Sequence, residues 1–328
     1  MNKLKQVEPQ LARGAFREEL WESPEWVAEE KYDGDRRIAQ FIGAKLALTG
    51  RRKSVKDGLF IDKADNVLHL KPGPREMMLL QGAVLDGEIC LPSGYRLEHG
   101  EPASKYVTSI MGSKPPEALR KQRERGFLRY VIFDLVHPTM MQALRRDEVL
   151  RLVKLWNNEH VQHSMQAIKE KRRMYEDVTR SGGEGVILKN QAGLYGDHKS
   201  WVKVKNEFTA DVVIMGFKAA KEESTKSSGE TSRTKYAEAG LIGAVEFGQY
   251  HQAAPHGAKE PRKVGFCSGM DDATRAMFSA APKKWTGKVM EIKHNGREPK
   301  TGALRHPRFV RLRDDKKATD CVYRENET

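Results

Sequence analysis

The segment Glu30 to Arg36 contains the pattern Lys-x-Asp-Gly-x-Arg, and it constrains the fold of this chain more than any other segment. Four fixed residues should match by chance in roughly one chain of this length in a few hundred, because each type makes up about 5 to 7% of an average protein. The flanking residues 26–30 and 37–42 are typical of short strands, and the Asp33-Gly34 pair between them is typical of a turn. Lys31 is therefore predicted at a strand end, where a rigid sheet can orient its side chain.

Further apolar runs divide the chain into two predicted domains. In the first two-thirds, strands are predicted over residues 45–49, 83–89, 128–136, 185–189 and 201–205, with an amphipathic helix over residues 149–156. Beyond Lys205, β-branched runs at residues 211–217, 241–247, 264–266 and 289–292 suit a small antiparallel barrel. The sequence thus predicts a mixed α and β domain over residues 1–207 and a barrel over residues 208–328.

Cysteine usage and the lack of long apolar runs argue against several classes of protein. The three cysteines, with no Cys-x-x-Cys pair, do not support a disulfide framework or a zinc knuckle. No run of 18 apolar residues occurs, and the N-terminus leads into no apolar core, so neither a membrane span nor a signal peptide is supported. We expect an intracellular, cytoplasmic protein with no membrane partner.

The charge balance favours a polyanionic partner. Lys and Arg total 58 against 45 acidic residues, which gives a net charge of +13 and a pI near 9.5. Such a surface binds nucleic acid by releasing counterions, although charge alone does not distinguish DNA from RNA. Two short basic blocks within otherwise ordinary sequence supply candidate phosphate contacts: Arg120, Lys121, Arg123, Lys169, Lys171 and Arg172.

A series of polar motifs follows the lysine element in a fixed order. In that order they resemble the covalent nucleotidyltransferase superfamily of polynucleotide ligases and capping enzymes. The chain is most similar to the short, bacteriophage-type ATP-dependent DNA ligases, over essentially its whole length. The motifs are Arg51-Arg52, Asp86-Gly87-Glu88, Phe133-Asp134, Glu184 to Lys189, Trp201 to Lys205 and Arg313 to Lys316.

The resemblance implies an α+β fold with an N-terminal nucleotidyltransferase (adenylation) domain of antiparallel sheets flanked by helices. It implies a C-terminal oligonucleotide-binding (OB) barrel. Larger ligases carry a further helical DNA-binding domain ahead of the lysine element, and only 30 residues precede Lys31 here. We therefore expect the two domains of a monomer to hold nicked double-stranded DNA by themselves. Replication, repair and recombination all remain open as its use.

The chemistry of a lysine nucleophile explains why these residue types are needed. A lysine that attacks the α-phosphate of ATP must be deprotonated, yet its reference pKa is about 10.4. Nearby cations such as Arg36, Lys203 and Lys205 favour the neutral amine and also neutralise charge on the phosphoryl oxygens. Glu88 and Glu184 have the oxygen ligands that Mg²⁺ or Mn²⁺ prefers.

By resemblance, Lys31 forms the phosphoramidate to AMP, and Glu29 lies where adenine is recognised, with Glu30 beside it. The Phe133 ring is placed to stack on the base. The remaining expected nucleotide contacts are Arg36, Arg51, Arg52, Glu88, Lys189, Lys203 and Lys205, with Arg313 and Lys316 placed to orient the pyrophosphate. The family usually has Ser-Arg or Thr-Arg where this chain has Gly50-Arg51-Arg52, so the choice between the two arginines is left open.

Two alternatives are consistent with parts of this pattern. An RNA ligase or an RNA-capping guanylyltransferase would share the lysine chemistry but use a different base or strand. A non-catalytic basic DNA-binding protein would use the barrel alone. It should bind DNA without ever becoming labelled with AMP.

Overall fold

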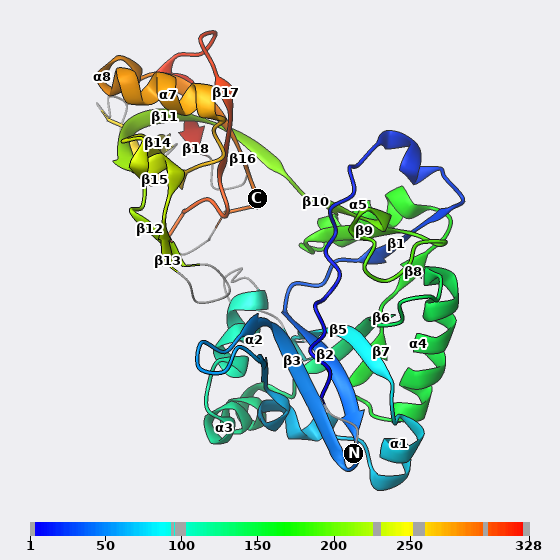
Figure 1. Cartoon of the computed structure of the whole chain (residues 1–328). Helices are drawn as coiled ribbons and strands as arrows, with labels where there is room; N and C mark the ends of the chain where they lie inside the picture. Colours follow the sequence, from blue (N-terminus) through cyan, green and yellow to red (C-terminus); the bar gives the residue numbers. More distant parts are fainter. Residues whose placement is uncertain are drawn as a thin grey trace. The chain divides into compact units, whose positions relative to one another are not determined.

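A computed structural model of the chain divides into two compact units, Met1–Lys205 and Asn206–Thr328 (Figure 1). The structure describes residues 4–92, 95, 103–225, 231–251, 260–297 and 301–323. Each unit has a hydrophobic core of its own. The sequence predicted a boundary after residue 207, close to this division.

The larger sheet of the first unit consists of β2 (Asp35–Ile42), β3 (Lys45–Lys53), β4 (Phe60–Asp62), β5 (Val84–Cys90), β6 (Arg129–Leu135) and β7 (Val161–His163). Its order is β4-β3-β2-β5-β6-β7, and every neighbouring pair is antiparallel except β6 and β7. The register of β2 with β5 places Arg36 opposite Glu88. Two residues of separate motifs therefore become neighbours.

The smaller sheet consists of β1 (Trp26–Glu30), β8 (Gln166–Ala167), β9 (Gly185–Asn190) and β10 (Trp201–Lys205). Its order is β10-β9-β1-β8, and all its pairs are antiparallel. Val202 is buried while Lys203 is exposed, as the two-residue period of a strand requires. The predicted strands at residues 26–30 and 201–205 are confirmed.

Helices and 3-10 turns complete the first unit. The predicted helix around residues 149–156 is confirmed as part of a longer helix, whose Val149, Leu152 and Trp156 are buried in the core of the larger sheet. A second helix, at residues 171–180, packs Met174 and Tyr175 onto the core of the smaller sheet. No helix in the described ranges is long and apolar enough to cross a membrane. The elements are η1 (Glu18–Trp21), η2 (Ala64–Leu70), α1 (Pro74–Leu79), α2 (Ala103–Met111), α3 (Pro115–Arg125), α4 (Gln142–Trp156), α5 (Lys171–Arg180) and η4 (His198–Ser200).

Residues 4–17 form an extended segment, here called the N-terminal strap, which contacts both sheets. Near its start, Lys5 exchanges two hydrogen bonds with the Gln40 side chain of β2, at 2.9 and 2.8 Å. Near its end, the Gly14 N–H donates to the carbonyl oxygen of Trp201 at 2.9 Å. The strap therefore ties the two sheets together, and no pattern in the sequence predicted it.

The second unit is built on β11 (Phe208–Ala219), β14 (Ile242–His251), β15 (Arg262–Cys267), β16 (Val289–His294) and β17 (Arg308–Leu312). These strands follow the order β15-β14-β11-β16-β17. A parallel bridge between Ser268 and Arg308 joins the two outer strands, so the sheet closes into a five-stranded barrel with the connectivity of an OB fold. The predicted fold class is confirmed. The other elements are β12 (Glu223–Thr225), β13 (Thr231–Arg233), α6 (Lys235–Glu238), α7 (Asp272–Ala280), α8 (Pro282–Trp285), η5 (Ala318–Asp320) and β18 (Val322–Tyr323).

Candidate active site

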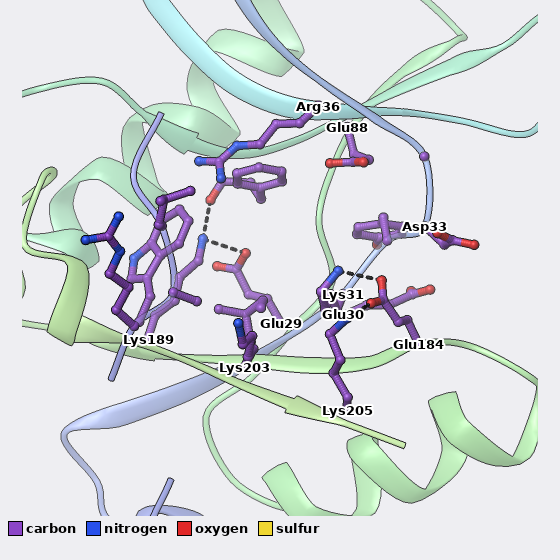
Figure 2. A pocket seen from close by; sticks show the side chains of 18 of the residues that line it. Glu29, Glu30, Lys31, Asp33, Arg36, Glu88, Glu184, Lys189, Lys203 and Lys205 are labelled. Carbon is purple, nitrogen blue, oxygen red and sulfur yellow. Dashed lines mark hydrogen bonds and ion pairs between the residues drawn. The ribbon is translucent and has the colours of Figure 1, made fainter. Parts of the chain in front are cut away.

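A pocket of about 510 Å³ lies in the first unit, with walls from both sheets (Figure 2). This volume is within the usual range for small-molecule and cofactor sites. The smaller sheet contributes β1, β9 and β10, and the larger sheet contributes β2, β3, β5 and β6. The lining residues are Leu11, Ala12, Arg13, Glu29, Glu30, Lys31, Tyr32, Asp33, Gly34, Arg36, Arg51, Glu88, Phe133, Glu184, Ile187, Lys189, Trp201, Lys203 and Lys205.

Lys31 follows the last residue of β1, and its main chain continues the sheet. Its N–H donates to the carbonyl oxygen of Gly185 at 2.9 Å. Gly34 has no room for a side chain, because a Cβ there would lie 2.0 Å from the Ile89 carbonyl oxygen. The glycine thus allows the segment after Lys31 to lie directly against β5, as the motif requires.

Glu184 holds two of the pocket lysines. Its Oε2 contacts the Lys31 ammonium and its Oε1 contacts the Lys205 ammonium. Burial alone would raise the pKa of Glu184, but the two lysines outweigh that effect and keep the pKa below its usual range. The carboxylate therefore stays ionised and fixes both amino groups on one side of the pocket (Figure 2).

A buried ion pair forms another wall of the pocket. Lys189 Nζ lies 2.9 Å from Glu29 Oε2 and donates to the carbonyl oxygen of Phe133 at 2.6 Å. Ser164 Oγ donates to the same Glu29 oxygen at 2.8 Å. Both charged side chains are 1% exposed. Because each is hydrogen-bonded, this buried pair can persist beside the Phe133 ring.

Arg36 is held by a carboxylate from the neighbouring strand. Its Nε and Nη2 donate to the two oxygens of Asp86, at 2.9 and 2.5 Å. Burial disfavours the charge, yet the attraction and hydrogen bonds of Asp86 raise the pKa of Arg36 above its ordinary value. Its guanidinium carbon lies 5.2 Å from the Phe133 ring centroid and 5.6 Å from that of Trp201. Arg36 is therefore a fixed cation at an aromatic wall.

Glu88 is a pocket carboxylate whose protonated form is favoured. Burial raises its pKa to about 8, although Lys31 and Arg36 oppose this shift. Burial also raises the pKa of Glu30, which lines the same pocket. An added cation beside Glu88 would favour its ionised form.

The residues present fit a hard divalent ion only as part of its ligand shell. Glu88 and Glu184 both line the pocket, but the described part of the chain contains no group of three or more His, Cys, Asp or Glu that could hold a metal. Mg²⁺ commonly takes one or two protein carboxylates and completes its shell with water and phosphate oxygens. The donor set agrees with that arrangement.

The structure brings most of the predicted site residues of the first unit to this one pocket. Of the two neighbouring arginines on β3, Arg51 lines it and Arg52 does not. Successive residues of a strand point to opposite faces, so both cannot enter the same cavity. The predicted residues along the pocket are Glu29, Glu30, Lys31, Arg36, Arg51, Glu88, Phe133, Glu184, Lys189, Lys203 and Lys205.

The two predicted residues of the second unit form a local ion-pair network. Arg313 Nη2 lies 2.7 Å from Asp315, and its Nη1 lies 3.1 Å from Asp211 on β11. Lys316 Nζ lies 3.6 Å from the same Asp211. Both remain predicted pyrophosphate contacts.

Sequence reasoning missed the part of the N-terminal strap that lines the pocket: Leu11, Ala12 and Arg13. Among the described residues, Arg13, Arg51 and Lys203 are the pocket cations with no carboxylate within 4.0 Å. They are the cations best placed to bind an anionic ligand. No pattern around Arg13 could have revealed this, because its position depends on contacts with distant β10.

The residues of the two basic blocks differ in exposure and in ion pairing, so they are not equally available to phosphate. Lys171 is 3% exposed, and its Nζ donates to the carbonyl oxygens of Ser23 and Ile168 at 3.1 and 3.2 Å. The prediction that Lys171 contacts phosphate is therefore wrong, because its ammonium is used inside the fold. Lys169 and Arg123 are exposed and remain candidates. Arg120, Lys121 and Arg172 form ion pairs with neighbouring glutamates.

Comparisons with known proteins agree with this fold and site. A family model described as an ATP dependent DNA ligase domain matches residues 9–205. A DNA ligase of Archaeoglobus fulgidus is 25% identical over 335 residues, which cover 92% of this chain and 53% of that protein. The chain thus spans about half the length of this curated relative.

Two solved structures share the fold. One, from a structure–function study of Lig E DNA ligases and DNA binding with a minimal scaffold, has a TM-score of 0.61 and 20% identity. It covers 94% of this chain and 99% of that chain. A structure named Pmar-Lig PreS3 also has a TM-score of 0.61, with 17% identity, and covers 88% of this chain and 63% of that chain.

Proposed function

The chain belongs to the ATP-dependent DNA ligase family, and on this premise we propose that it seals nicks in duplex DNA through a lysyl-AMP intermediate on Lys31. The observation that carries the proposal is that the Glu184 carboxylate forms ion pairs with both Lys31 and Lys205, inside a pocket that contains several other cations. The arrangement fixes a nucleophile beside a group that can bind phosphate.

In the first step the neutral amine of Lys31 attacks the α-phosphorus of ATP. A nitrogen–phosphorus bond forms, the bond to the bridging oxygen of pyrophosphate breaks, and the lysine loses a proton to solvent. Charge develops on the phosphoryl oxygens during this displacement, so fixed cations lower the barrier. Lys205 is held near Lys31 by Glu184, and no carboxylate in the described part of the chain lies within 4.0 Å of Lys203 or Arg51.

Glu88 and Glu184 would hold Mg²⁺ or Mn²⁺ through their carboxylate oxygens. When bound, the ion supplies positive charge to the phosphoryl oxygens. The raised pKa of Glu88, about 8, supports a cation next to it. Arg13, on the strap, adds a further positive group to the pocket.

Binding of the base is assigned to the aromatic wall. Phe133 is partly exposed and lines the pocket, so its face can stack on adenine. Glu29 is at the pocket surface but accepts hydrogen bonds from Lys189, Ser164 and Gln166. Lys189 and Ser164 both bind Glu29 Oε2, whereas Oε1 accepts a longer, 3.3 Å bond from Gln166. We therefore assign any contact of Glu29 with the base to Oε1.

The later steps use the polynucleotide. AMP passes from Lys31 to the 5′-phosphate of the nick, and the 3′-hydroxyl then attacks that phosphate to release AMP. We assign binding of the duplex to both units, with the exposed Lys169 and Arg123 as contacts to DNA phosphates. Arg313 and Lys316 are assigned to the pyrophosphate of ATP in the first step. We expect a monomer, and the three free, buried cysteines are consistent with the reducing cytoplasm, of the host if the protein is viral.

Labelling with α-³²P nucleotide tests the proposal. Wild-type protein with Mg²⁺ and ATP should form an acid-labile, base-stable adduct, and Lys31→Ala should form none. The control is Lys199→Ala, which changes an exposed lysine outside the pocket and should label normally. Nicked DNA added to the adduct should remove the label. Labelling by GTP alone, or discharge by RNA but not DNA, would support the alternative enzymes. No adduct with either nucleotide would leave a non-catalytic DNA-binding protein.

A further inference from the structure

Four residues from distant parts of the chain form a closed ring of hydrogen bonds at the edge of the pocket. Arg36 donates to both Asp86 oxygens, and its Nη1 donates to the Gln10 carbonyl oxygen at 2.7 Å. The Gln10 N–H donates to the Tyr195 hydroxyl oxygen at 3.2 Å. That hydroxyl donates to Asp86 Oδ2 at 2.7 Å, which closes the ring.

Most of the ring is buried and Tyr195 is half-buried, which limits the competition of water for its hydrogen bonds. The Asp86 side chain is fully buried, that of Arg36 is 13% exposed, and Gln10 is fully buried. A buried charge that loses a partner pays the full cost of its missing solvation. Burial and the nearby Asp86 raise the pKa of Tyr195 well above its usual range, so its hydroxyl keeps its proton. Tyr195 is therefore a permanent donor to Asp86.

Tyr195 is itself held on more than one side. It lies between β9 and η4, and the N–H of the next residue, Gly196, donates to the Gln10 side-chain oxygen at 2.7 Å. The Arg145 guanidinium lies 5.8 Å from the Tyr195 ring centroid. The Trp201 ring lies 6.5 Å from it, nearly perpendicular at 85°. The hydroxyl is thus fixed in place rather than free to follow Asp86.

Arg36 lies between this ring and the pocket. Its guanidinium faces Phe133 and Trp201, and it lines the cavity in which the nucleotide is proposed to bind. Tyr195 does not line that cavity. Its hydroxyl therefore acts on the nucleotide indirectly, through its hydrogen-bond partners. Asp86 connects it to Arg36 in the cavity wall, and Gln10 connects it to the strap.

We propose that Tyr195 is a positioning residue for adenylation, whose hydroxyl orients Asp86 so that the Arg36 guanidinium keeps its place against the pocket. The effect of Tyr195 on catalysis rests on the proposed function. The orientation of Arg36 is a property of the protein without any nucleotide.

The catalytic test is a double-mutant cycle with Tyr195→Phe and Arg36→Lys, read as kcat/KM for lysyl-AMP formation. Tyr195→Phe alone should lower kcat/KM roughly ten-fold, the size expected for a hydrogen bond to a charged group. In the Arg36→Lys background, where the two-pronged grip on Asp86 is lost, it should change the rate less than about two-fold. Equal factors in the two backgrounds would overturn the proposal. Tyr236→Phe, which removes a 2.8 Å bond to Asp272 on the second unit, is the matched control and should keep the wild-type rate.

A second measurement needs no activity. The Nε–H signal of Arg36 in ¹⁵N-labelled protein should exchange slowly with water in the wild type and in Tyr236→Phe. In Tyr195→Phe it should exchange roughly ten-fold faster, because its acceptor becomes less well held. Unchanged exchange in Tyr195→Phe would overturn the proposal even if the wild type formed an adduct. Faster exchange in a protein that never labels would instead leave the positioning role intact and remove the proposed function.

Discussion

The ammonium group of Lys31 and the carboxylate of Glu184 form an ion pair in the pocket, although 153 residues separate them in sequence. The other oxygen of the same carboxylate holds Lys205. A single acidic residue thus places the proposed nucleophile and a proposed phosphate-binding cation side by side. It connects the end of β1 to β10. This relationship makes Glu184 the most informative residue to change.

Replacing Glu184 by Gln should reduce lysyl-AMP formation by roughly 100-fold, the size seen when one preorganised electrostatic contact is removed. The amide keeps the shape of the side chain, but without a charge it can neither hold both amino groups in place nor offer a carboxylate to a divalent ion. The measurement is the single-turnover rate of adduct formation with labelled ATP. Glu176→Gln changes an exposed residue of α5 and should keep the wild-type rate. A Glu184→Gln rate within about three-fold of wild type would contradict the assigned role.

The raised pKa of Glu88 should make the stability of the protein depend on pH. Its pKa is about 8 in the folded chain and 4.5 when unperturbed, so the folded state binds the extra proton between these values. Its contribution to stability is therefore complete below about pH 4.5, is lost as the pH rises towards 8, and then stays constant. Urea unfolding of wild type and Glu88→Gln without metal should show the variant gaining relative stability from pH 5 to 8.

Mg²⁺ provides the control for this prediction. If Glu88 helps to hold the ion, Mg²⁺ should stabilise the wild type at pH 8 more than it stabilises Glu88→Gln. A stability difference between the two proteins that is independent of pH would show that the Glu88 carboxyl is not shifted.

Arg51 and Arg52 form a natural matched pair. Arg51 lines the pocket and Arg52 does not, although both are exposed residues of β3. Arg51→Ala should raise the KM for ATP roughly 10- to 100-fold, since a hydrogen bond to a charged group contributes about 1.5 to 3 kcal/mol. Arg52→Ala should leave it within about two-fold. The reverse order would assign the nucleotide contact to Arg52.

These residues also show how far a sequence can predict a site. The motifs predicted the strands β1 and β10 and most of the pocket residues, because each motif lies on an element with a clear apolar period. Sequence could not choose between Arg51 and Arg52, since the choice depends on which face of β3 meets the second sheet. Sequence could not distinguish Lys171 from its exposed neighbour Lys169, because burial of a lysine within a basic run depends on tertiary packing. Arg13 was missed because strap and β10 meet only in the folded chain.

Lys169 and Lys171 should respond differently to substitution, since one is exposed and the other is 3% exposed. Lys171→Met removes the ammonium group that donates to the Ser23 and Ile168 carbonyl oxygens and should cost about 1 to 3 kcal/mol of stability. It should not change how DNA affinity depends on salt. Lys169→Ala should keep the stability and lower the slope of log affinity against log salt by about one. Chemical denaturation and DNA titrations at several salt concentrations measure both effects.

Gly185, beside the active site, should not tolerate a side chain. Its φ is +131°, and a Cβ would lie 2.1 Å from the Val204 carbonyl oxygen on the paired strand β10. Gly185→Ala must therefore push β9 and β10 apart, which costs more than the about 1 to 3 kcal/mol of an unfavourable backbone conformation alone. Gly182→Ala is the control, because its φ is +84° but a Cβ there meets nothing within 4 Å. Since Glu184 precedes Gly185 and contacts Lys205, Gly185→Ala should also lose adduct formation, whereas Gly182→Ala should lose only stability. Equal stability losses for the two variants would show that close strand pairing next to Glu184 does not require glycine.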